Sequence, residues 1–205
     1  MLETGYLTLF RIRGVPVRAH WTLPLGMILF TGGRMAPGLW LGFLALIVIH
    51  ELGHAFVVHR VGLANLGVRL HGMGGECRWA GSPTPIQRAL VAWGGVLAQL
   101  PILVVTLILV AVLGSPSGGF LADLVYAFTF TNALLIGLNL IPLGPLDGRE
   151  AWPLFGLWWA ERKRRQKWKQ KVAPKEPRSK KDRRDQGPQT LRQALEEADR
   201  QKRDP

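Results

Sequence analysis

The sequence predicts an all-α polytopic membrane protein with about four transmembrane helices, followed by a basic tail. The 205 residues are 48% hydrophobic, yet they include 26 Lys and Arg against 14 Asp and Glu, for a formal net charge of +12. The charge is concentrated at one end: residues 149–205 hold 18 basic and 9 acidic side chains, whereas residues 1–148 hold 8 and 5. Long apolar runs in a weakly charged body are typical of a membrane-embedded domain.

Three runs are long and apolar enough to cross about 30 Å of hydrocarbon, which takes about 20 helical residues. They are Leu39–Val58, Ala89–Leu113 and Phe120–Ile141. A fourth crossing is expected at His20–Gly33, a shorter run that contains glycine. The alternative is a set of buried helices in a soluble core. Such helices usually carry a polar face, but Ala89–Leu113 offers only Gln99 and Thr106 as amide or hydroxyl side chains.

The segment between the second and third crossings, Leu66–Trp79, is too short and too polar to cross. It contains four glycines with apolar residues around them, which predicts a short Gly-rich re-entrant hairpin. Backbone that is not helical at membrane depth has to be buried in protein or to line a water-filled cavity. We therefore expect this hairpin to form a wall of a functional site.

The arginines of the short loops predict the orientation of the chain. The first 18 residues are mixed in character and do not read as a secretory signal peptide, so we expect the N-terminus to be retained. Lys and Arg favour cytosolic loops. With the N-terminus in the cytosol, every arginine of residues 1–148 except Arg34 falls on the cytosolic side. The expected location is a prokaryotic cytoplasmic membrane, crossed several times, with both termini in the cytosol.

Two parts are expected, a membrane-embedded domain over residues 1–159 and a basic cytosolic tail over residues 160–205. The tail contains runs such as ERKRRQKWKQK, which cannot bury enough apolar surface to fold, so it is expected to be largely disordered and to lie on anionic lipid. A short helix is expected over residues 190–203, where leucine and alanine recur at helical spacing. The tail has no recognisable nucleic-acid-binding fold and no aromatic platform, so no nucleic-acid partner is expected.

The strongest motif is HELGH at residues 50–54, inside the second crossing. A single cysteine, Cys77, excludes a disulfide framework and a cysteine-rich metal site, so metal chemistry has to use histidine and carboxylate. Residues i and i+4 project from one face of a helix, so His50 and His54 can share one metal ion, with Glu51 beside them. Ionisable groups inside an apolar span point to function. The alternative is a pair of core histidines bonded to neighbouring helices.

Catalytic zinc usually takes three protein ligands and leaves one position for water. The third ligand is expected to be Asp147, in the segment NLIPLGPLDG at residues 139–148. The last crossing returns there to the side of HELGH and is broken by prolines, so the chain can fold back and present a carboxylate. Among the other histidines, His59 faces the opposite side of its helix, and His20 and His71 are placed by no motif.

These features resemble the site-2 proteases, the intramembrane zinc metalloproteases of the M50 peptidase group. The resemblance rests on HELGH, on NLIPLGPLDG, which matches the family's Asn-x-x-Pro…Leu-Asp-Gly pattern, and on the Gly-rich HGMGGECRW stretch between them. It extends over roughly residues 14–150 and implies that His50, His54 and Asp147 bind one zinc ion per chain. It also implies that Glu51 is the catalytic base.

The resemblance implies an endopeptidase that hydrolyses peptide bonds in or near transmembrane segments of membrane-protein substrates, as in regulated intramembrane proteolysis. Asn139 is expected to stabilise the oxyanion of the transition state. The chain departs from the family where many relatives carry Gly-Pro-x-x-Asn, because Gln99 stands at the last position. It resembles a compact form without PDZ or CBS domains. The alternatives are a catalytically inactive metal-binding membrane scaffold, which would not need Glu51, and a metal transporter.

Overall fold

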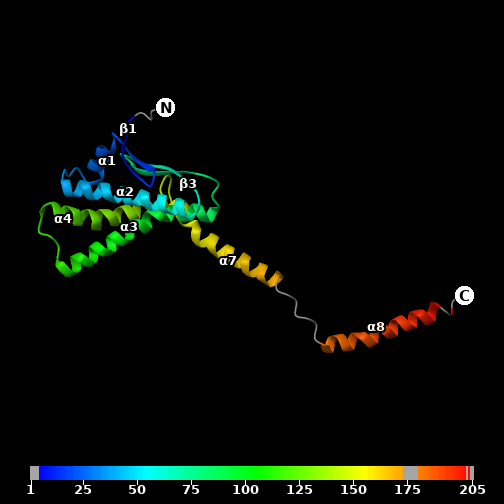
Figure 1. Ribbon diagram of the computed structural model, residues 1–205. Coiled ribbons are helices and arrows are strands. Elements are labelled where there is room, and N and C mark those ends of the chain that lie inside the picture. Colours follow the sequence, from blue (N-terminus) through cyan, green and yellow to red (C-terminus); the bar gives the residue numbers. More distant parts are fainter. Residues whose placement is uncertain (1–4, 173–179, 202, 204–205) are drawn as a thin grey trace. The chain divides into compact units, whose positions relative to one another are not determined.

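The computed structural model describes residues 5–172, 180–201 and 203 (Figure 1). The chain divides into two compact units, Met1–Glu161 and Arg162–Pro205. The first unit holds a sheet, the apolar helices and the candidate site. Parts of the predicted basic tail lie outside the described residues, namely 173–179, 202, 204 and 205.

A four-stranded sheet is the main departure from the all-α prediction, which is therefore wrong. Its strands, in spatial order, are β1 (Tyr6–Ile12), β2 (Val15–His20), β3 (Ala64–His71) and β4 (Gly74–Ala80). The pairs β1–β2 and β3–β4 are antiparallel hairpins, and β2 and β3 are parallel. The hairpin expected at Leu66–Trp79 is confirmed as β3–β4. The all-α prediction did not include the N-terminal hairpin β1–β2, which pairs with β3–β4 to complete the sheet.

The run His20–Gly33, expected to be a fourth crossing, is not a single helix. His20 ends β2, and α1 covers only Leu23–Phe30, eight residues or about 12 Å of helix. Hydrogen bonds of Thr22 hold the segment between β2 and α1 in place. Thr22 Oγ1 lies 2.8 Å from His20 Nδ1 and accepts a hydrogen bond of 3.1 Å from the Gly72 backbone N–H in the β3–β4 turn.

Among the described residues, three helical stretches are long and apolar enough to cross a membrane. They are α2 (Pro37–Arg60), α3 (Pro85–Leu113) and a composite of α4 (Gly119–Tyr126), the π-helical turn η1 (Ala127–Thr131) and α5 (Asn132–Asn139). The prediction of about four transmembrane helices is corrected to three candidates, which coincide with the three long apolar runs of the sequence.

Helices α2 and α3 approach closely because glycines meet at their crossing. A β-carbon on Gly53 would collide with the Gly94 carbonyl oxygen, and one on Gly94 would lie 2.7 Å from the Gly53 carbonyl oxygen. Small residues at a helix crossing let the two backbones come together in this way. The contact brings α3 against the face of α2 that carries the HELGH motif.

The sheet lies along another side of α2 (Figure 1). Its buried side chains pack with α2 in a core that includes Val17, Val68, Leu70, Phe43 and Ile47. Strand β4 is an edge strand of the sheet, and among the described residues its outer edge has no neighbouring strand. The HELGH turn of α2 therefore lies between α3 and the edge of a small sheet.

The chain reverses direction after α5. This helix ends at Asn139, three residues before Pro142, and the short helix α6 (Gly148–Ala151) follows the turn. Two tryptophans tie the reversal down. Trp152 Nε1 donates to the Leu140 carbonyl oxygen at 2.7 Å, and Trp93 Nε1 of α3 donates to the Ala151 carbonyl oxygen at 2.9 Å.

Two charged helices follow. Helix α7 (Pro153–Val172) begins in the first unit and contains the whole ERKRRQKWKQK run. Helix α8 (Lys180–Gln201) belongs to the second unit and includes residues 190–201 of the segment where a short helix is expected. Their described side chains are largely exposed.

Candidate metal centre

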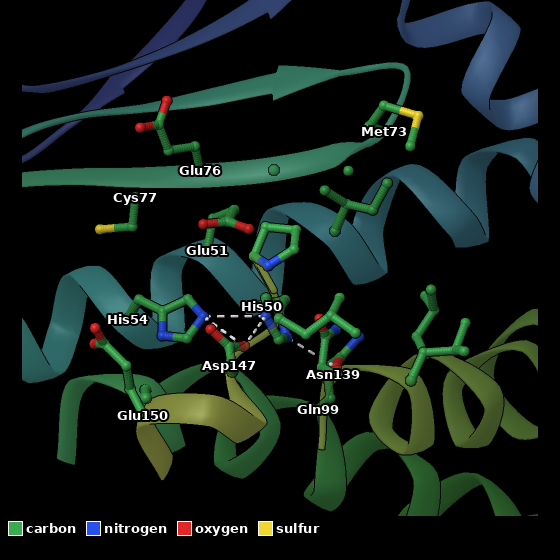
Figure 2. Close-up of a pocket in the computed structure, with 18 of the residues that line it drawn as sticks. His50, Glu51, His54, Met73, Glu76, Cys77, Gln99, Asn139, Asp147 and Glu150 are labelled. Atoms are coloured by element: carbon green, nitrogen blue, oxygen red, sulfur yellow. Dashed lines mark hydrogen bonds and ion pairs between the residues drawn. The ribbon is translucent and has the colours of Figure 1, made fainter. Parts of the chain in front are cut away.

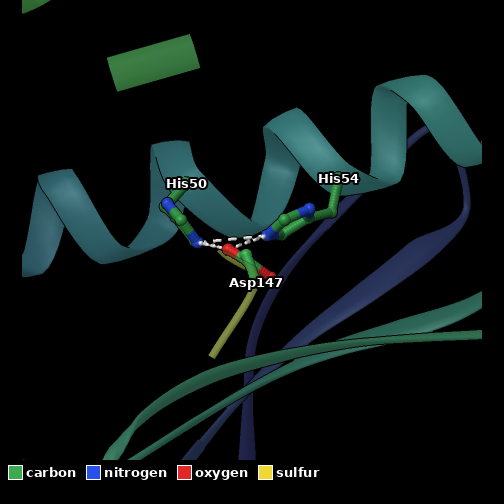
Figure 3. Close-up of side chains that lie close together, drawn as sticks. All are labelled: His50, His54 and Asp147. Atoms are coloured by element: carbon green, nitrogen blue, oxygen red, sulfur yellow. Dashed lines mark hydrogen bonds and ion pairs between the residues drawn. The ribbon is translucent and has the colours of Figure 1, made fainter. Parts of the chain in front are cut away.

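The two HELGH histidines and Asp147 come together although 97 residues separate His50 from Asp147 (Figure 3). Both imidazoles are buried and project from one side of α2. Their Nε2 atoms lie 3.0 Å apart, and Asp147 Oδ2 lies 2.9 Å from His50 Nε2 and 3.2 Å from His54 Nε2. The three candidate ligand atoms all fall within 4.8 Å of one another, so this group could hold a metal ion.

Helix α3 orients both imidazole rings through their Nδ1 atoms. His54 Nδ1 donates to the Val91 carbonyl oxygen at 2.7 Å, and His50 Nδ1 lies 3.0 Å from Gln99 Oε1. A carbonyl oxygen can only accept, so Nδ1 of His54 carries a proton and Nε2 is the atom left for a metal. Both rings are therefore held with Nε2 toward Asp147.

This donor set fits zinc. Two imidazole nitrogens and one carboxylate oxygen form a common set for catalytic zinc, which keeps a fourth position for water or substrate. With Nδ1 protonated and the rings neutral, both Nε2 atoms and the Asp147 oxygen are acceptors crowded into one small volume. A cation shared by the three satisfies all of them at once.

The environment of Asp147 favours its ionised form. Burial by itself raises the pKa of this carboxyl, but in the protein without metal the hydrogen bonds that the His50 and His54 rings donate to it outweigh burial and hold the pKa low, at about 2. A bound cation takes the place of the protons on those Nε2 atoms. Asp147 also begins α6, where its carbonyl oxygen accepts from the backbone N–H of Ala151 at 2.8 Å. The residue is thus fixed in position and carries the negative charge that a metal ligand needs.

Glu51 lies on the side of α2 that faces β4 (Figure 2). It is buried, and its carboxylate packs against Gly75 of β4 so closely that a β-carbon there would collide with it. The same cavity, of about 890 Å³, is lined by Glu51, by the three candidate ligands and by Asn139 at the end of α5. All five residues predicted for the site therefore line one cavity.

Cys77 also lines this cavity, from β4 (Figure 2). Burial raises the pKa of its thiol to about 12, and the nearby carboxylates of Glu51 and Glu76 act in the same direction. The thiol therefore stays protonated at neutral pH in the protein without metal, and Cys77 does not belong to the group of gathered ligand atoms, which comes from His50, His54 and Asp147. This agrees with the expectation that metal chemistry here uses histidine and carboxylate.

The other histidines lie outside the cluster. His59 is exposed at the end of α2, and His20 contacts Thr22. His71 lines the cavity, but its Nδ1 accepts from the Met73 backbone N–H at 3.3 Å. None of the three belongs to the group that could hold a metal ion.

Two contacts of the site were missed in the sequence. Gln99 was expected only to be a polar side chain of its apolar run and a departure from the family pattern, and no contact with the site was predicted for it. In the structure it contacts His50 directly. Gly95 lies beneath the imidazoles, where a β-carbon would lie 2.6 Å from the Nε2 atoms of both His50 and His54. The signal for Gln99 was present, since it is one of the few polar side chains in its apolar run.

Comparisons with known proteins agree with this site. No family model matches the chain. It is 28% identical over 148 residues to zinc metalloprotease MJ0392 of Methanocaldococcus jannaschii, a match that covers 69% of this chain and 43% of that protein. It is 31% identical over 162 residues to Rip3 of Mycobacterium tuberculosis strain H37Rv, named provisionally as a zinc metalloprotease, with 69% and 41% covered. The chain thus spans less than half the length of these relatives.

The fold also has a counterpart among solved structures. The site-2 protease from Methanocaldococcus jannaschii matches with a TM-score of 0.57 and 26% identity, over 73% of this chain and 71% of that one. The sequence resemblance, the relatives named as zinc metalloproteases and the shared fold agree with one another. The chain belongs to the site-2 protease family of intramembrane zinc metalloproteases.

Proposed function

We propose that this protein is a zinc endopeptidase that hydrolyses peptide bonds in or near transmembrane segments of membrane proteins. The observation that carries the proposal is the meeting of His50, His54 and Asp147, with ligand atoms within 4.8 Å, in a cavity that Glu51 also lines. The two histidines lie on α2, a helix apolar enough to cross a membrane. The relatives are named as zinc metalloproteases, and the proposal carries both the metal and the proteolytic activity over to this chain.

Each residue of the site has a role in this reaction. His50, His54 and Asp147 hold the zinc, which when bound acts as a Lewis acid toward a carbonyl and makes a water nucleophilic at neutral pH. Glu51 accepts the proton of the attacking water as the C–O bond to the carbonyl carbon forms, and it then passes that proton to the amine nitrogen, so that the C–N bond breaks and the amine leaves neutral. Asn139 donates a hydrogen bond to the developing oxyanion.

The cavity suits an extended peptide. The amides of a transmembrane helix are bonded within the helix, so a substrate has to unwind locally before one of its carbonyl groups can enter the site. Strand β4 lines the cavity, and in the described part of the chain it pairs with a strand on one side only, β3. An unwound segment can pair with such an edge, which presents its backbone beside Glu51.

The surface of the helices supports a membrane location. Large apolar side chains such as Val105, Ile108 and Val112 are at least half exposed on α3, which suits contact with lipid. We propose a multi-pass protein of a prokaryotic cytoplasmic membrane with both termini in the cytosol. Three candidate crossings alone would put the two ends on opposite sides, so this proposal requires the segment that contains α1 to pass through the membrane as well.

The tail is proposed to contact the same membrane. Described residues of α7 include Trp158, Trp159 and Trp168 among lysines and arginines. Tryptophan favours the membrane interface, and clustered basic residues are attracted to anionic lipid headgroups. The division proposed is a protease domain over residues 1–159 and a lipid-binding tail over residues 160–205.

The decisive experiment separates proteolysis from metal binding. Wild-type and Glu51→Gln protein are reconstituted in liposomes with a panel of single-span membrane-protein segments, and cleavage and zinc content are measured together. We expect Glu51→Gln to keep its zinc and to lose cleavage. His59→Ala, a change on the same helix outside the cluster, serves as the control. Undiminished cleavage by Glu51→Gln would remove the enzyme assignment, and zinc binding without cleavage by wild type would favour a scaffold.

A further inference from the structure

Gln99 is a fully buried amide in a helix that is otherwise almost entirely apolar. Only 1% of the residue is exposed. Moving an amide out of water without hydrogen bonds destabilises a protein, so a buried glutamine in a membrane helix needs a partner. The Gln99 side chain contacts the metal-cluster residue His50, whose Nδ1 lies 3.0 Å from Gln99 Oε1 (Figure 2).

The group of Gln99 that faces His50 determines which ring nitrogen of His50 carries the proton. A neutral imidazole carries one proton, either on Nδ1 or on Nε2. If Nδ1 donates to the amide oxygen, Nε2 keeps its lone pair and faces Asp147, which lies 2.9 Å away. If the amide NH₂ group faced Nδ1 instead, the proton would have to sit on Nε2 and would block the metal. An acceptor at residue 99 is therefore what prepares His50 to bind a cation.

The Nδ1 atom of His54 also donates a hydrogen bond, but its acceptor is a backbone carbonyl oxygen. His54 Nδ1 donates to the backbone carbonyl oxygen of Val91, a group that cannot be changed by a side-chain substitution. His50 relies on a side chain for this function. Among the described residues, Gln99 is thus the one side chain whose replacement would release the Nδ1 bond of a cluster histidine and leave the cluster residues intact.

A second buried amide supports Gln99 from the third apolar stretch. Asn132, fully buried, follows the π-helical turn η1, and its Nδ2 donates to the Gln99 carbonyl oxygen at 3.2 Å. Single π-turns within helices are frequent at functional sites. The extra residue of such a turn rotates the helix that follows, and here the residue directly after the turn is the one that reaches α3.

We propose that Gln99 is a positioning residue: its amide oxygen holds the Nδ1–H form of His50, so that Nε2 is available to the metal. The inference rests on the proposed zinc site. Partners of this kind around metal-binding histidines change metal affinity by about 10- to 100-fold when they are replaced. This role in metal binding is assigned to Gln99, the residue that stands where many relatives carry asparagine.

The test compares two substitutions of equal length. Gln99→Met keeps the volume and removes the acceptor, whereas Gln99→Glu keeps both length and acceptor. Zinc affinity of the purified full-length proteins is measured by competition with a chromophoric chelator. We expect Gln99→Met to bind zinc at least about tenfold more weakly than wild type, and Gln99→Glu to bind it about as tightly or more tightly.

Thr106→Val is the matched control, because Thr106 is the other buried polar residue of the α3 apolar run and its hydroxyl donates within its own helix, to the Ile102 carbonyl oxygen at 2.8 Å. Its zinc affinity is expected to equal that of wild type. A purely structural role for Gln99 predicts the reverse order, since an apolar isostere is tolerated in an apolar helix and a buried carboxylate is not.

Three outcomes would overturn the proposal. The first is equal zinc affinity of folded Gln99→Met and wild type. The second is a folded Gln99→Glu protein whose zinc affinity falls as far as the proposal expects for Gln99→Met, and this result counts even where Gln99→Met does not fold. The third is a wild type that binds no zinc, which overturns the proposed function as well; the first two leave the proposed function standing.

Discussion

Gly95 of α3 lies directly against His50 of α2: a β-carbon at residue 95 would lie 2.6 Å from His50 Nε2 and would also collide with Cε1 of the same ring. A β-carbon there would be equally close to His54 Nε2. The smallest residue is therefore required at the point where the two metal-facing nitrogens meet the neighbouring helix. The backbone of α3 forms the floor of the candidate metal centre.

Gly95→Ala should abolish or strongly weaken zinc binding. Real β-carbons essentially never approach other atoms this closely, so both rings or the two helices must shift, and the metal-facing nitrogens lose their arrangement. We expect zinc affinity to fall by at least about tenfold, measured by chelator competition. Gly137→Ala on α5, where nothing lies within 4 Å of the new methyl, should bind zinc like wild type. Equal zinc affinity of the two variants would show that the structure around residue 95 can accommodate a methyl group without disturbing the metal centre.

Asp147→Asn should separate the charge of the third ligand from its shape. The substitution keeps the size of the side chain and removes the negative charge that its low pKa maintains. A neutral amide is a poor partner for a divalent cation, so we expect zinc content per chain to drop well below one in equilibrium dialysis at limiting zinc. Asp123→Asn on α4, outside the cavity, is the control. A fully loaded Asp147→Asn protein would mean that another group supplies the third ligand.

The pairing of His50 with His54 could be predicted because it depends only on local geometry. Four residues along a helix return a side chain to nearly the same face, whatever the rest of the fold does. The approach of Asp147 could be predicted from the order of the apolar runs and from the prolines that end the last of them. A long-range contact can be predicted from one sequence when local features, such as these prolines, determine where the chain turns back.

The sheet and Gln99 show where sequence reasoning stops. Strand β2 pairs with β3 across about fifty residues, for example Val17 with Val68, and no local pattern specifies that partnership. The apolar content of His20–Gly33 suggested a helix, but its first residue completes β2. The amide of Gln99 was visible in an apolar run, yet its partner depends on how α3 is rotated about its axis against α2, which the Gly53–Gly94 contact sets.

Gly75→Ala should damage proteolysis and leave metal binding intact. A β-carbon at this position of β4 would collide with the Glu51 carboxylate, whereas the glycine itself needs no unusual backbone angle. The carboxylate has to move, and a displacement of about 1 Å in a catalytic group can cost on the order of 100-fold in rate. We expect the cleavage rate in the liposome assay to fall by at least about tenfold, with zinc content near one per chain. Loss of zinc together with loss of cleavage would contradict the idea that β4 positions the catalytic carboxylate whereas α3 orients the metal ligands.

Zinc should stabilise the folded protein in proportion to its binding. A ligand that binds only the folded state at 100 times its Kd adds about 2.7 kcal/mol to the free energy of unfolding. Thermal unfolding in detergent should therefore show a higher Tm with zinc than after removal of metal by a chelator. His59→Ala, exposed and outside the cluster, should keep the full zinc-dependent shift, whereas His50→Ala should lose it because one of three ligands is gone. An equal shift in both variants would place the stabilising zinc somewhere other than this cluster.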